Sequence, residues 1–218
     1  MEPIRALLFD WRGTLVRALP FEEWIAEALR AVGSDAGPNS VARVRRQLVS
    51  TSNFKDLEAP GIDSDSAWHR STYLRIFQEA GMDRDLSEAL YAVESDANFN
   101  PFADDVAPAL KAFKSKHVKV GVVSDIHFDI RPAFERVGLL EWIDCFVLSY
   151  EQGVEKPHPK MFTFALEKLE AKPSETLMVG DRPEYDGASV RVGIAALLLP
   201  TLTSVHDGRM KLVEALLT

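Results

Sequence analysis

Two hydrophobic patterns divide this chain into regions. Residues 4–9 (IRALLF), and several short segments after residue 100, are nearly continuous apolar runs that end in polar residues. Between these regions, apolar residues recur every three or four positions. Continuous runs are typical of parallel strands covered on both faces, whereas the three-or-four spacing is typical of amphipathic helices. The patterns predict an α/β protein with a helical segment inserted after its first strand.

The inserted segment is predicted to contain four helices. The first lies between Pro20 and Gly33, residues that favour the start and the end of a helix. The predicted helices cover residues 21–32, 41–49, about 66–80 and about 86–93. Because no strand pattern interrupts them, we expect a helical domain at residues 17–99 and a discontinuous core domain at residues 1–16 and 100–218.

Three side chains of the helical segment have alternative interpretations. Trp68 follows the helical spacing, so we expect it in the segment's own core together with the other aromatic residues. Lys55 and His69 are polar and would reach across a cleft if they were functional. A lone lysine or histidine is more often solvated or structurally bonded, and we interpret both in that way.

From Pro101 onward, strand patterns alternate with helix patterns. The predicted strands cover residues 118–124, 145–149, 176–179 and 194–199. The predicted helices cover residues 106–116, 130–137, 160–169, 188–192 and about 208–216. Since consecutive parallel strands are joined by right-handed crossovers, this alternation predicts a Rossmann-like three-layer core, with a parallel sheet between two helical layers.

Composition narrows the classes of protein and partner. Of the 218 residues, 46% are hydrophobic, which is enough for a sizeable core and a smaller second one. The net charge is -8 and the basic residues form no cluster, so we expect no nucleic-acid partner. No apolar run is long enough to span a bilayer, and the single cysteine, Cys145, fits a reducing compartment. We expect a cytoplasmic protein without a membrane partner, either a monomer or a homodimer.

Polar residues follow the ends of successive predicted strands. Because the carboxyl ends of parallel strands meet at one edge of a sheet, these side chains are expected to converge there. The residues are Asp10 after the first strand, Ser124 and Asp125 after the second, Lys156 after the third, and Asp181 and Asp186 after the fourth. Converging carboxylates are costly unless a cation or a reaction uses them, so this edge is the predicted site.

These residue types suggest phosphoryl chemistry. Clustered carboxylates without histidine or cysteine ligands suit Mg²⁺ better than zinc. Together with Lys156, the ion would neutralise a phosphate that Asp10 otherwise repels, and the Asp10 carboxylate would then attack phosphorus. Ser124 and the backbone N–H groups after Asp10 would donate hydrogen bonds to the phosphoryl oxygens, while Gly13 lets the backbone approach closely. The predicted partner is a small phosphorylated molecule.

Four segments together resemble the motifs of the haloacid dehalogenase-like (HAD) hydrolase superfamily. They are FDWRGTL at 9–15, VVSD at 122–125, GVEKPHP at 153–159 and VGDRPEYDG at 179–187, and they span essentially the whole chain. The resemblance implies that the helical segment is a cap over the active site. It implies that Asp10 is the nucleophile, and that Asp10, the backbone carbonyl of Arg12, Asp181 and Asp186 hold Mg²⁺.

The candidate residues fall into three groups. We assign Asp10, Ser124 and Lys156 to catalysis. We assign Trp11, Arg12, Gly13 and Asp125 to substrate binding, and Asp10, Arg12 through its carbonyl, Asp181 and Asp186 to the metal. The expected activity is hydrolysis of a phosphate ester through an aspartyl-phosphate at Asp10.

Arg12 departs from the pattern of the phosphatases in this superfamily, which resemble the chain but carry a second aspartate at that position. That aspartate protonates the leaving alcohol, whereas a guanidinium stays protonated and transfers no proton. Losing a general acid costs about 10²- to 10⁴-fold, so a slow phosphatase is expected. The alternatives are a dehalogenase-like or phosphonatase-like hydrolase, and a phosphate- or partner-binding protein without turnover.

Two further hypotheses concern the group that supplies the missing proton and the partner of Arg12. His127, three residues after Ser124, is a candidate for supplying it, against the commoner interpretation of a packing histidine. Arg12 itself is expected to pair with a substrate anion or with a carboxylate of the helical segment such as Glu22 or Glu23, which would hold the cap closed.

Overall fold

The computed structural model describes residues 3–217, and its centre is a five-stranded parallel sheet with the strand order β3-β2-β1-β4-β5. The central strand, β1, pairs with β2 on one side and β4 on the other, and all four of its residues are buried. This double covering explains the continuous apolar run and confirms the predicted α/β class. The strands are β1 (Ala6–Phe9), β2 (Lys119–Ser124), β3 (Cys145–Leu148), β4 (Thr176–Gly180) and β5 (Ala195–Leu198).

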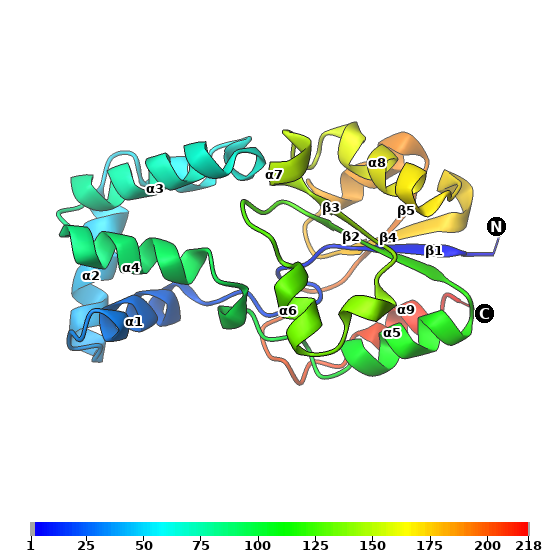
Figure 1. The fold of residues 1–218 in the computed structure, drawn as a ribbon, viewed down its shortest axis with the longest axis horizontal. Helices are drawn as coiled ribbons and strands as arrows, with labels where there is room; N and C mark the ends of the chain where they lie inside the picture. Colours follow the sequence, from blue (N-terminus) through cyan, green and yellow to red (C-terminus); the bar gives the residue numbers. More distant parts are fainter. Residues whose placement is uncertain (1–2, 218) are drawn as a thin grey trace.

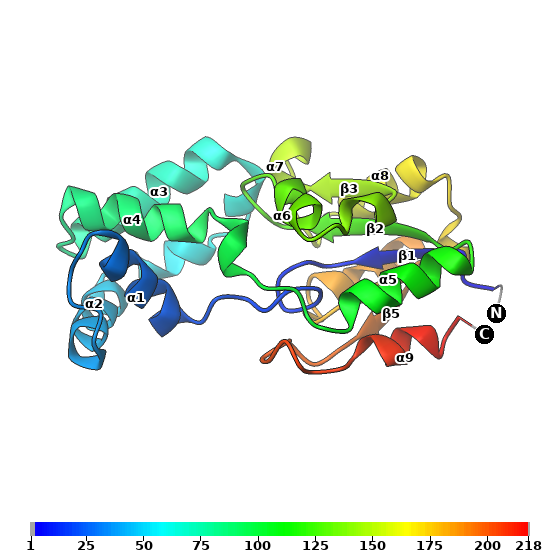
Figure 2. The ribbon, with the colours of Figure 1, turned by 60° about the horizontal axis from the view of Figure 1, so that its bottom comes forward.

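Helices cover both faces of the sheet (Figures 1 and 2). Alternate residues of a strand point to opposite faces, and β1 accordingly divides its side chains between two hydrophobic clusters. Leu7 and Phe9 pack with α5 (Val106–Ser115), α6 (Arg131–Arg136) and α9 (Met210–Glu214). Ala6 and Leu8 pack with α8 (Pro159–Leu169) and with the 3₁₀ helix η6 (Asp186–Val192).

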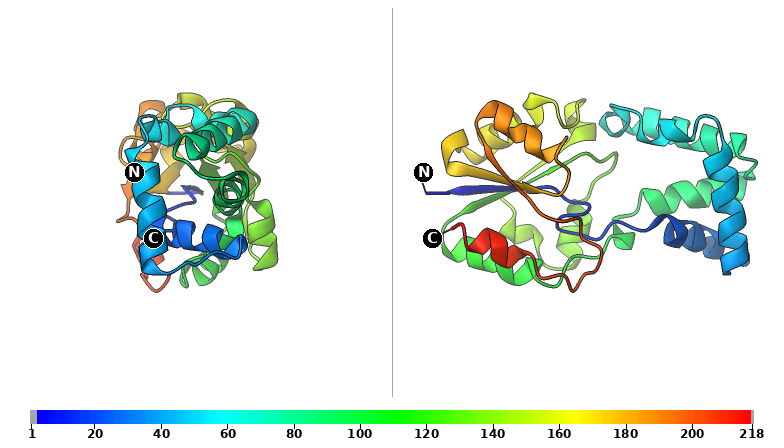
Figure 3. Two further views of the ribbon diagram at one scale, coloured as in Figure 1. Left: turned by 90° about the vertical axis from the view of Figure 1, so that its left-hand side faces the viewer. Right: turned by 180° about the vertical axis from the view of Figure 1, so that it is seen from behind.

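The helices between β1 and α5 lie together at one end of the molecule (Figure 3) and have a hydrophobic cluster of their own. We call residues 17–99 the helical insert, and their bounds as a domain stay a prediction. The helices of the insert are α1 (Phe21–Ala31), α2 (Pro38–Ser50), α3 (Ser66–Glu79) and α4 (Arg84–Glu94), with the 3₁₀ helices η1 (Phe54–Glu58), η2 (Ile62–Ser64) and η3 (Ala97–Phe99). The remaining short elements are α7 (Ser149–Gln152), η4 (Leu140–Trp142) and η5 (Pro173–Glu175).

The sheet directs its strand ends toward the insert. In Figure 1 the chain enters β1 from the end of the molecule that lies away from the insert. Because every strand pair is parallel, all the carboxyl ends face the insert. Within residues 3–217, no helix combines the length and apolar character that crossing a membrane requires.

Three local predictions were wrong. Trp68 is 43% exposed, because the buried face of α3 begins one residue later, at His69. The helix predicted at 188–192 is a 3₁₀ helix that begins at Asp186, whose carboxylate accepts the N–H groups of Asp181 and Arg182 and so tightens the turn before it. The last helix is shorter than predicted, since it covers only Met210–Glu214.

Candidate active site

Lys156 joins two carboxylates at the carboxyl edge of the sheet. Its Nζ lies 2.6 Å from Oδ1 of Asp10, which follows β1, and 2.6 Å from Oδ1 of Asp186, which follows β4. The Lys156 side chain is only 2% exposed. The strand ends therefore bring together three residues that are 146 and 30 positions apart in the sequence.

Burial sets the protonation equilibria of this cluster. Loss of solvent raises the pKa of Asp10 to about 6, although the neighbouring Lys156 opposes the shift. Burial also opposes the charge on Lys156, but Asp10 and Asp186 outweigh it and hold the pKa of this ammonium above its ordinary value. Lys156 is thus a permanent cation beside a carboxylate that ionises near neutral pH.

Gly13 allows the loop after β1 to pass close to Asp181. Its φ is +80°, and a Cβ at this position would lie 2.5 Å from Oδ2 of Asp181. A side chain is therefore excluded both by the backbone conformation and by the lack of space. Asp181 Oδ2 accepts a hydrogen bond of 2.7 Å from Thr201, while its Oδ1 is buried and has no partner within residues 3–217.

The carboxylates of this cluster fit a divalent cation. Oxygens of Asp10, Asp181 and Asp186 lie within 4.8 Å of one another, and Lys156 balances only part of their charge. Asp181 Oδ1 offers an unused buried acceptor. Asp186 contributes less, because its Oδ2 already accepts two backbone N–H groups and its Oδ1 contacts Lys156. Hard oxygen ligands of this kind favour Mg²⁺ or a similar ion.

The end of β2 delivers Ser124 and Asp125 to the same edge. Ser124 is buried, and Asp125 Oδ1 accepts the backbone N–H of Lys156 at 2.7 Å. This bond ties the loop that carries Lys156 to β2. Burial raises the pKa of Asp125 to about 7, with Asp10 and Glu155 adding to the rise and Lys156 opposing it.

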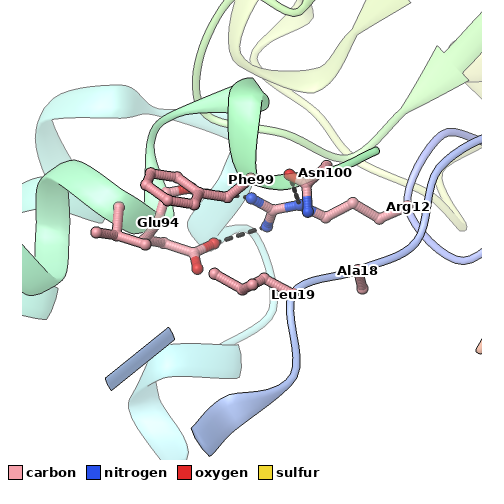
Figure 4. A pocket seen from close by; sticks show the side chains of 7 residues that line it. Arg12, Ala18, Leu19, Glu94, Phe99 and Asn100 are labelled. Carbon is pink, nitrogen blue, oxygen red and sulfur yellow. Dashed lines mark hydrogen bonds and ion pairs between the residues drawn. The ribbon is translucent and has the colours of Figure 1, made fainter. Parts of the chain in front are cut away.

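Arg12 is turned toward the insert (Figure 4). Its Nη1 lies 2.6 Å from Oε1 of Glu94, its Nη2 donates to the Glu94 carbonyl at 2.9 Å, and its Nε donates to Asn100 at 3.4 Å. Burial opposes the guanidinium charge, but Glu94 outweighs it and raises the pKa of Arg12. Arg12 is therefore a fixed cation that links the loop after β1 to the end of α4.

Arg12 pairs with a carboxylate of the insert, as predicted, but this carboxylate belongs to neither Glu22 nor Glu23. Glu22 pairs with Arg45, and Glu23 pairs with Arg17, both within the insert. Glu94 takes the predicted role because it is the last residue of α4, where the chain turns back toward the core.

Two residues assigned to substrate binding occupy other roles. The Trp11 side chain is fully buried and packs edge-on against Phe128, so it contacts the core. The backbone N–H of Gly13 donates to the Val16 carbonyl at 2.8 Å, so it is not free for a ligand. Within residues 3–217, the backbone N–H groups of Trp11 and Arg12 have no hydrogen-bond partner, so Trp11 can offer a donor through its backbone but not through its side chain.

His127 belongs to a second cluster, between the loop after β2 and the insert. Its Nε2 lies 2.9 Å from Ser95 Oγ, and its Nδ1 lies 3.3 Å from Asp63 Oδ1. Its ring stacks on His69, with centroids 3.4 Å apart. Because both ring nitrogens are engaged by the insert, His127 has the position of a packing histidine.

One residue that sequence reasoning missed holds the loop after β1 from the far end of the chain. Arg209 donates to the carbonyl groups of Gly13, Thr14 and Pro200, and it is almost fully buried. No motif or hydrophobic spacing marks Arg209, so the sequence contained no signal for this role. Glu94 and Thr201 were missed for the same reason.

A cavity of about 640 Å³ lies between the core and the insert. Its core side includes Arg12 and Asp125, and its insert side is largely aromatic and aliphatic. The lining residues of the insert include Phe21, Trp24, Phe54, Leu57, Ile62 and Tyr73. Lys55 also lines the cavity and is exposed. The cavity is therefore large enough for a small organic molecule, and it meets the carboxyl edge of the sheet at Asp125.

Comparison with known proteins identifies the class. A sequence profile described as haloacid dehalogenase-like hydrolase matches residues 4–191, well over half of the chain. The chain belongs to the haloacid dehalogenase-like hydrolase family and is a hydrolase of that family.

Individual relatives include proteins named phosphatases. Ribulose-1,5-bisphosphate 5-phosphatase from Halopiger xanaduensis is 34% identical over 96 residues, which are 43% of this chain and 40% of that protein. The chain thus matches only about two fifths of this relative's length. Phosphoserine phosphatase from Thermus thermophilus is 26% identical over 224 residues, with 89% and 88% of the two chains covered.

The fold is also found among solved structures. A HAD-superfamily hydrolase of subfamily IA, variant 1, from Geobacter sulfurreducens superimposes with a TM-score of 0.67 and 17% identity, covering 99% of this chain and 97% of that chain. At this level of identity the likeness shows the fold alone. The chemistry of the site, and not this likeness, bears on the activity.

Proposed function

We propose that this protein hydrolyses a small phosphorylated metabolite through an aspartyl-phosphate at Asp10. One observation carries the proposal: the buried Asp10 carboxylate lies 2.6 Å from the Lys156 ammonium, among carboxylates that need a further cation. A phosphate with its own negative charge approaches such a carboxylate only where cations offset the repulsion. The names of the relatives support this substrate class.

Mg²⁺ is the proposed cofactor. Asp10, Asp181 and the backbone carbonyl of Arg12 would hold it, with Asp186 close by and largely occupied by Lys156 and the turn before η6. The unpartnered, buried Oδ1 of Asp181 supports this assignment. When bound, the ion would neutralise charge on the phosphate oxygens.

Side chains of the protein carry out the nucleophilic attack and hold the phosphate. The Asp10 carboxylate attacks phosphorus, and Lys156 holds that carboxylate in place while neutralising phosphate charge. Ser124 donates its hydroxyl hydrogen bond to a phosphoryl oxygen. Arg12 holds the insert through Glu94 and moves no proton, because its guanidinium remains charged.

Hydrolysis of p-nitrophenyl phosphate tests the proposal. Its leaving group is a stable anion that needs little protonation, so the assay isolates attack by Asp10. We expect Mg²⁺-dependent turnover, or a burst, in the wild-type protein and a loss of at least about 10³-fold in Asp10→Asn. The matched control is Asp85→Asn, an exposed carboxylate in the first turn of α4.

Two outcomes contradict the proposal. Equal activity in the wild type and Asp10→Asn would exclude Asp10 as the nucleophile. Neither burst nor turnover in a folded wild-type protein would indicate a phosphate- or partner-binding protein.

A further inference from the structure

The proposed reaction contains a proton transfer for which Arg12 is unsuited. The oxygen that leaves phosphorus needs a proton, unless its anion is as stable as p-nitrophenolate. Arg12 stands two residues after Asp10, but its guanidinium is engaged by Glu94 and Asn100. Another group must therefore supply the proton.

The carboxylates that line the cavity are the candidates. They are Glu58, Asp63, Glu94, Asp125 and Glu155. Glu94 is committed to Arg12, and Asp63 contacts His127 in the second cluster. Of the five, Asp125 is the one that directly follows a strand of the sheet, next to Ser124.

Two of the other candidates are held by or on the insert. Glu155 accepts the backbone N–H of Gly61, so its carboxylate links the core to the insert. Glu58 is the last residue of η1, on the exposed side of the insert. Glu155 precedes Lys156 on the same loop, but its carboxylate is engaged by the insert, and Glu58 lies on the insert itself.

Asp125 has one oxygen fixed and one available. Its Oδ1 accepts the Lys156 backbone N–H at 2.7 Å, and the Nζ of that same lysine contacts Asp10. One residue thus connects Asp125 to the proposed nucleophile. Asp125 also lines the cavity, and its Oδ2 has no hydrogen-bond partner among residues 3–217, so we take this oxygen as the one left for a bound molecule.

We propose that Asp125 is the general acid and base of this site. It performs the proton transfer that the arginine at position 12 is unable to perform. The inference rests on the proposed function. It assigns proton transfer to a residue outside the loop that carries the nucleophile.

The two steps balance as follows. Asp10 forms a bond to phosphorus, the bond from phosphorus to the ester oxygen breaks, and that oxygen takes its electron pair and the proton of the Asp125 carboxyl group. In the second step, the Asp125 carboxylate takes a proton from water as the water oxygen attacks phosphorus. The bond to Asp10 then breaks, which releases phosphate and restores both carboxyl groups.

The surroundings of Asp125 suit both steps. Its pKa is raised to about 7, chiefly by burial and also by the negative charges of Asp10 and Glu155, while the positive charge of Lys156 opposes the rise. Near neutral pH, both the acid and the carboxylate are therefore populated. A general acid works best when its pKa lies near the working pH.

The substitution Asp125→Asn separates proton transfer from the structural role. An asparagine retains Oδ1 and can still accept the Lys156 N–H, but its amide group cannot act as a general acid or base. Two probes of nearly equal shape complete the test: p-nitrophenyl phosphate, whose leaving group needs little protonation, and phenyl phosphate, whose leaving group needs more.

We expect Asp125→Asn to slow steady-state turnover of both probes, because hydrolysis of the aspartyl-phosphate is common to them. In single-turnover measurements of the first step, the variant should lose about 10²-fold in the release of phenol and markedly less in the release of p-nitrophenol. In the wild type, the single-turnover release of phenol should fall as the pH rises above about 7, and this dependence should vanish in the variant. The matched control is Asp129→Asn, an exposed carboxylate on the same loop that lies outside the cavity lining.

Each other outcome overturns the inference. Equal losses in the single-turnover release of phenol and of p-nitrophenol would show that Asp125 only positions Lys156. Unchanged rates on both would show that Asp125 has no role in the reaction. Failure of the wild type to hydrolyse p-nitrophenyl phosphate would refute the proposed function itself, and the inference with it.

Discussion

Two clusters of three titratable residues in this protein bring their polar atoms equally close together and differ in what they can do. Asp10, Asp181 and Asp186 gather at the carboxyl edge of the sheet, whereas Asp63, His69 and His127 gather where the insert meets the loop after β2. In both, the potential ligand atoms lie within 4.8 Å of one another.

The direction of the lone pairs separates the two clusters. The lone pair of an imidazole nitrogen lies in the plane of its ring. The rings of His69 and His127 are stacked with centroids 3.4 Å apart and are inclined by only 12°, so their planes meet far beyond the length of a metal–nitrogen bond. In the other cluster, Asp181 has a buried oxygen that no described residue contacts by a hydrogen bond. Neighbouring side chains with suitable ligand atoms form a metal site only where the lone pairs of those atoms point to one position.

The clusters also respond to pH in opposite directions. Burial raises the pKa of Asp10 from 3.8 to about 6, so the folded protein binds this proton more tightly and the contribution to stability falls as pH rises through that range. Burial lowers the pKa of His69 from 6.5 to about 3, so this contribution is present above pH 6.5 and is lost as pH falls toward 3.

Replacing His69 with phenylalanine should produce the largest change in stability. Phenylalanine retains the stacked ring but takes up no proton. Relative to the wild type, His69→Phe should gain about 3 kcal/mol in the free energy of unfolding between pH 7 and pH 4. Urea unfolding at the two pH values measures the gain.

The groups that face His69 remain in that variant. They include His127, Asp63 and Arg12, of which His127 and Arg12 oppose a charge on His69 and Asp63 favours it. His206→Phe, at an exposed histidine that pairs with Asp104, should show no such gain. A parallel loss of stability in the wild type and His69→Phe would show that His69 is not held neutral.

Magnesium should distinguish the two clusters by a smaller amount. A ligand at 100 times its dissociation constant stabilises a folded protein by about 2.7 kcal/mol. We expect MgCl₂ to stabilise the wild type against thermal unfolding relative to EDTA, Asp181→Asn to lose most of this effect, and His69→Phe to retain it. Full stabilisation of Asp181→Asn would refute the assignment of the metal to the sheet edge.

The Arg12–Glu94 ion pair, which joins the core to the insert, should have the smallest effect. Its side chains are 30% and 22% exposed, so we expect a coupling energy of about 1 kcal/mol in a double-mutant cycle with Arg12→Met and Glu94→Gln. The exposed pair Arg70 and Glu88 is the control, and its coupling should be at most about 0.5 kcal/mol. Equal coupling in the two pairs would mean that Arg12 adds nothing beyond a surface contact.

Local pattern was sufficient to predict the α/β class, the strand positions and the residues that meet at the sheet edge. Strand direction in a parallel sheet is fixed by its crossovers, so Asp10, Lys156 and Asp186 had to converge once their strands were recognised. The motif residues could be predicted from the sequence because each stands directly after an apolar run or in a short loop.

The tertiary structure alone decided how these side chains are used. Arg12 pairs with Glu94, 82 residues away, and Arg209 holds Gly13 from 196 residues away. Trp11 entered the core, and the two histidines stacked. Periodicity along a chain reports which face of an element is buried, but a side chain's partner depends on how distant elements pack. The protonation of Asp10 and Asp125 follows from the same packing, because it removes their water and sets the charges around them.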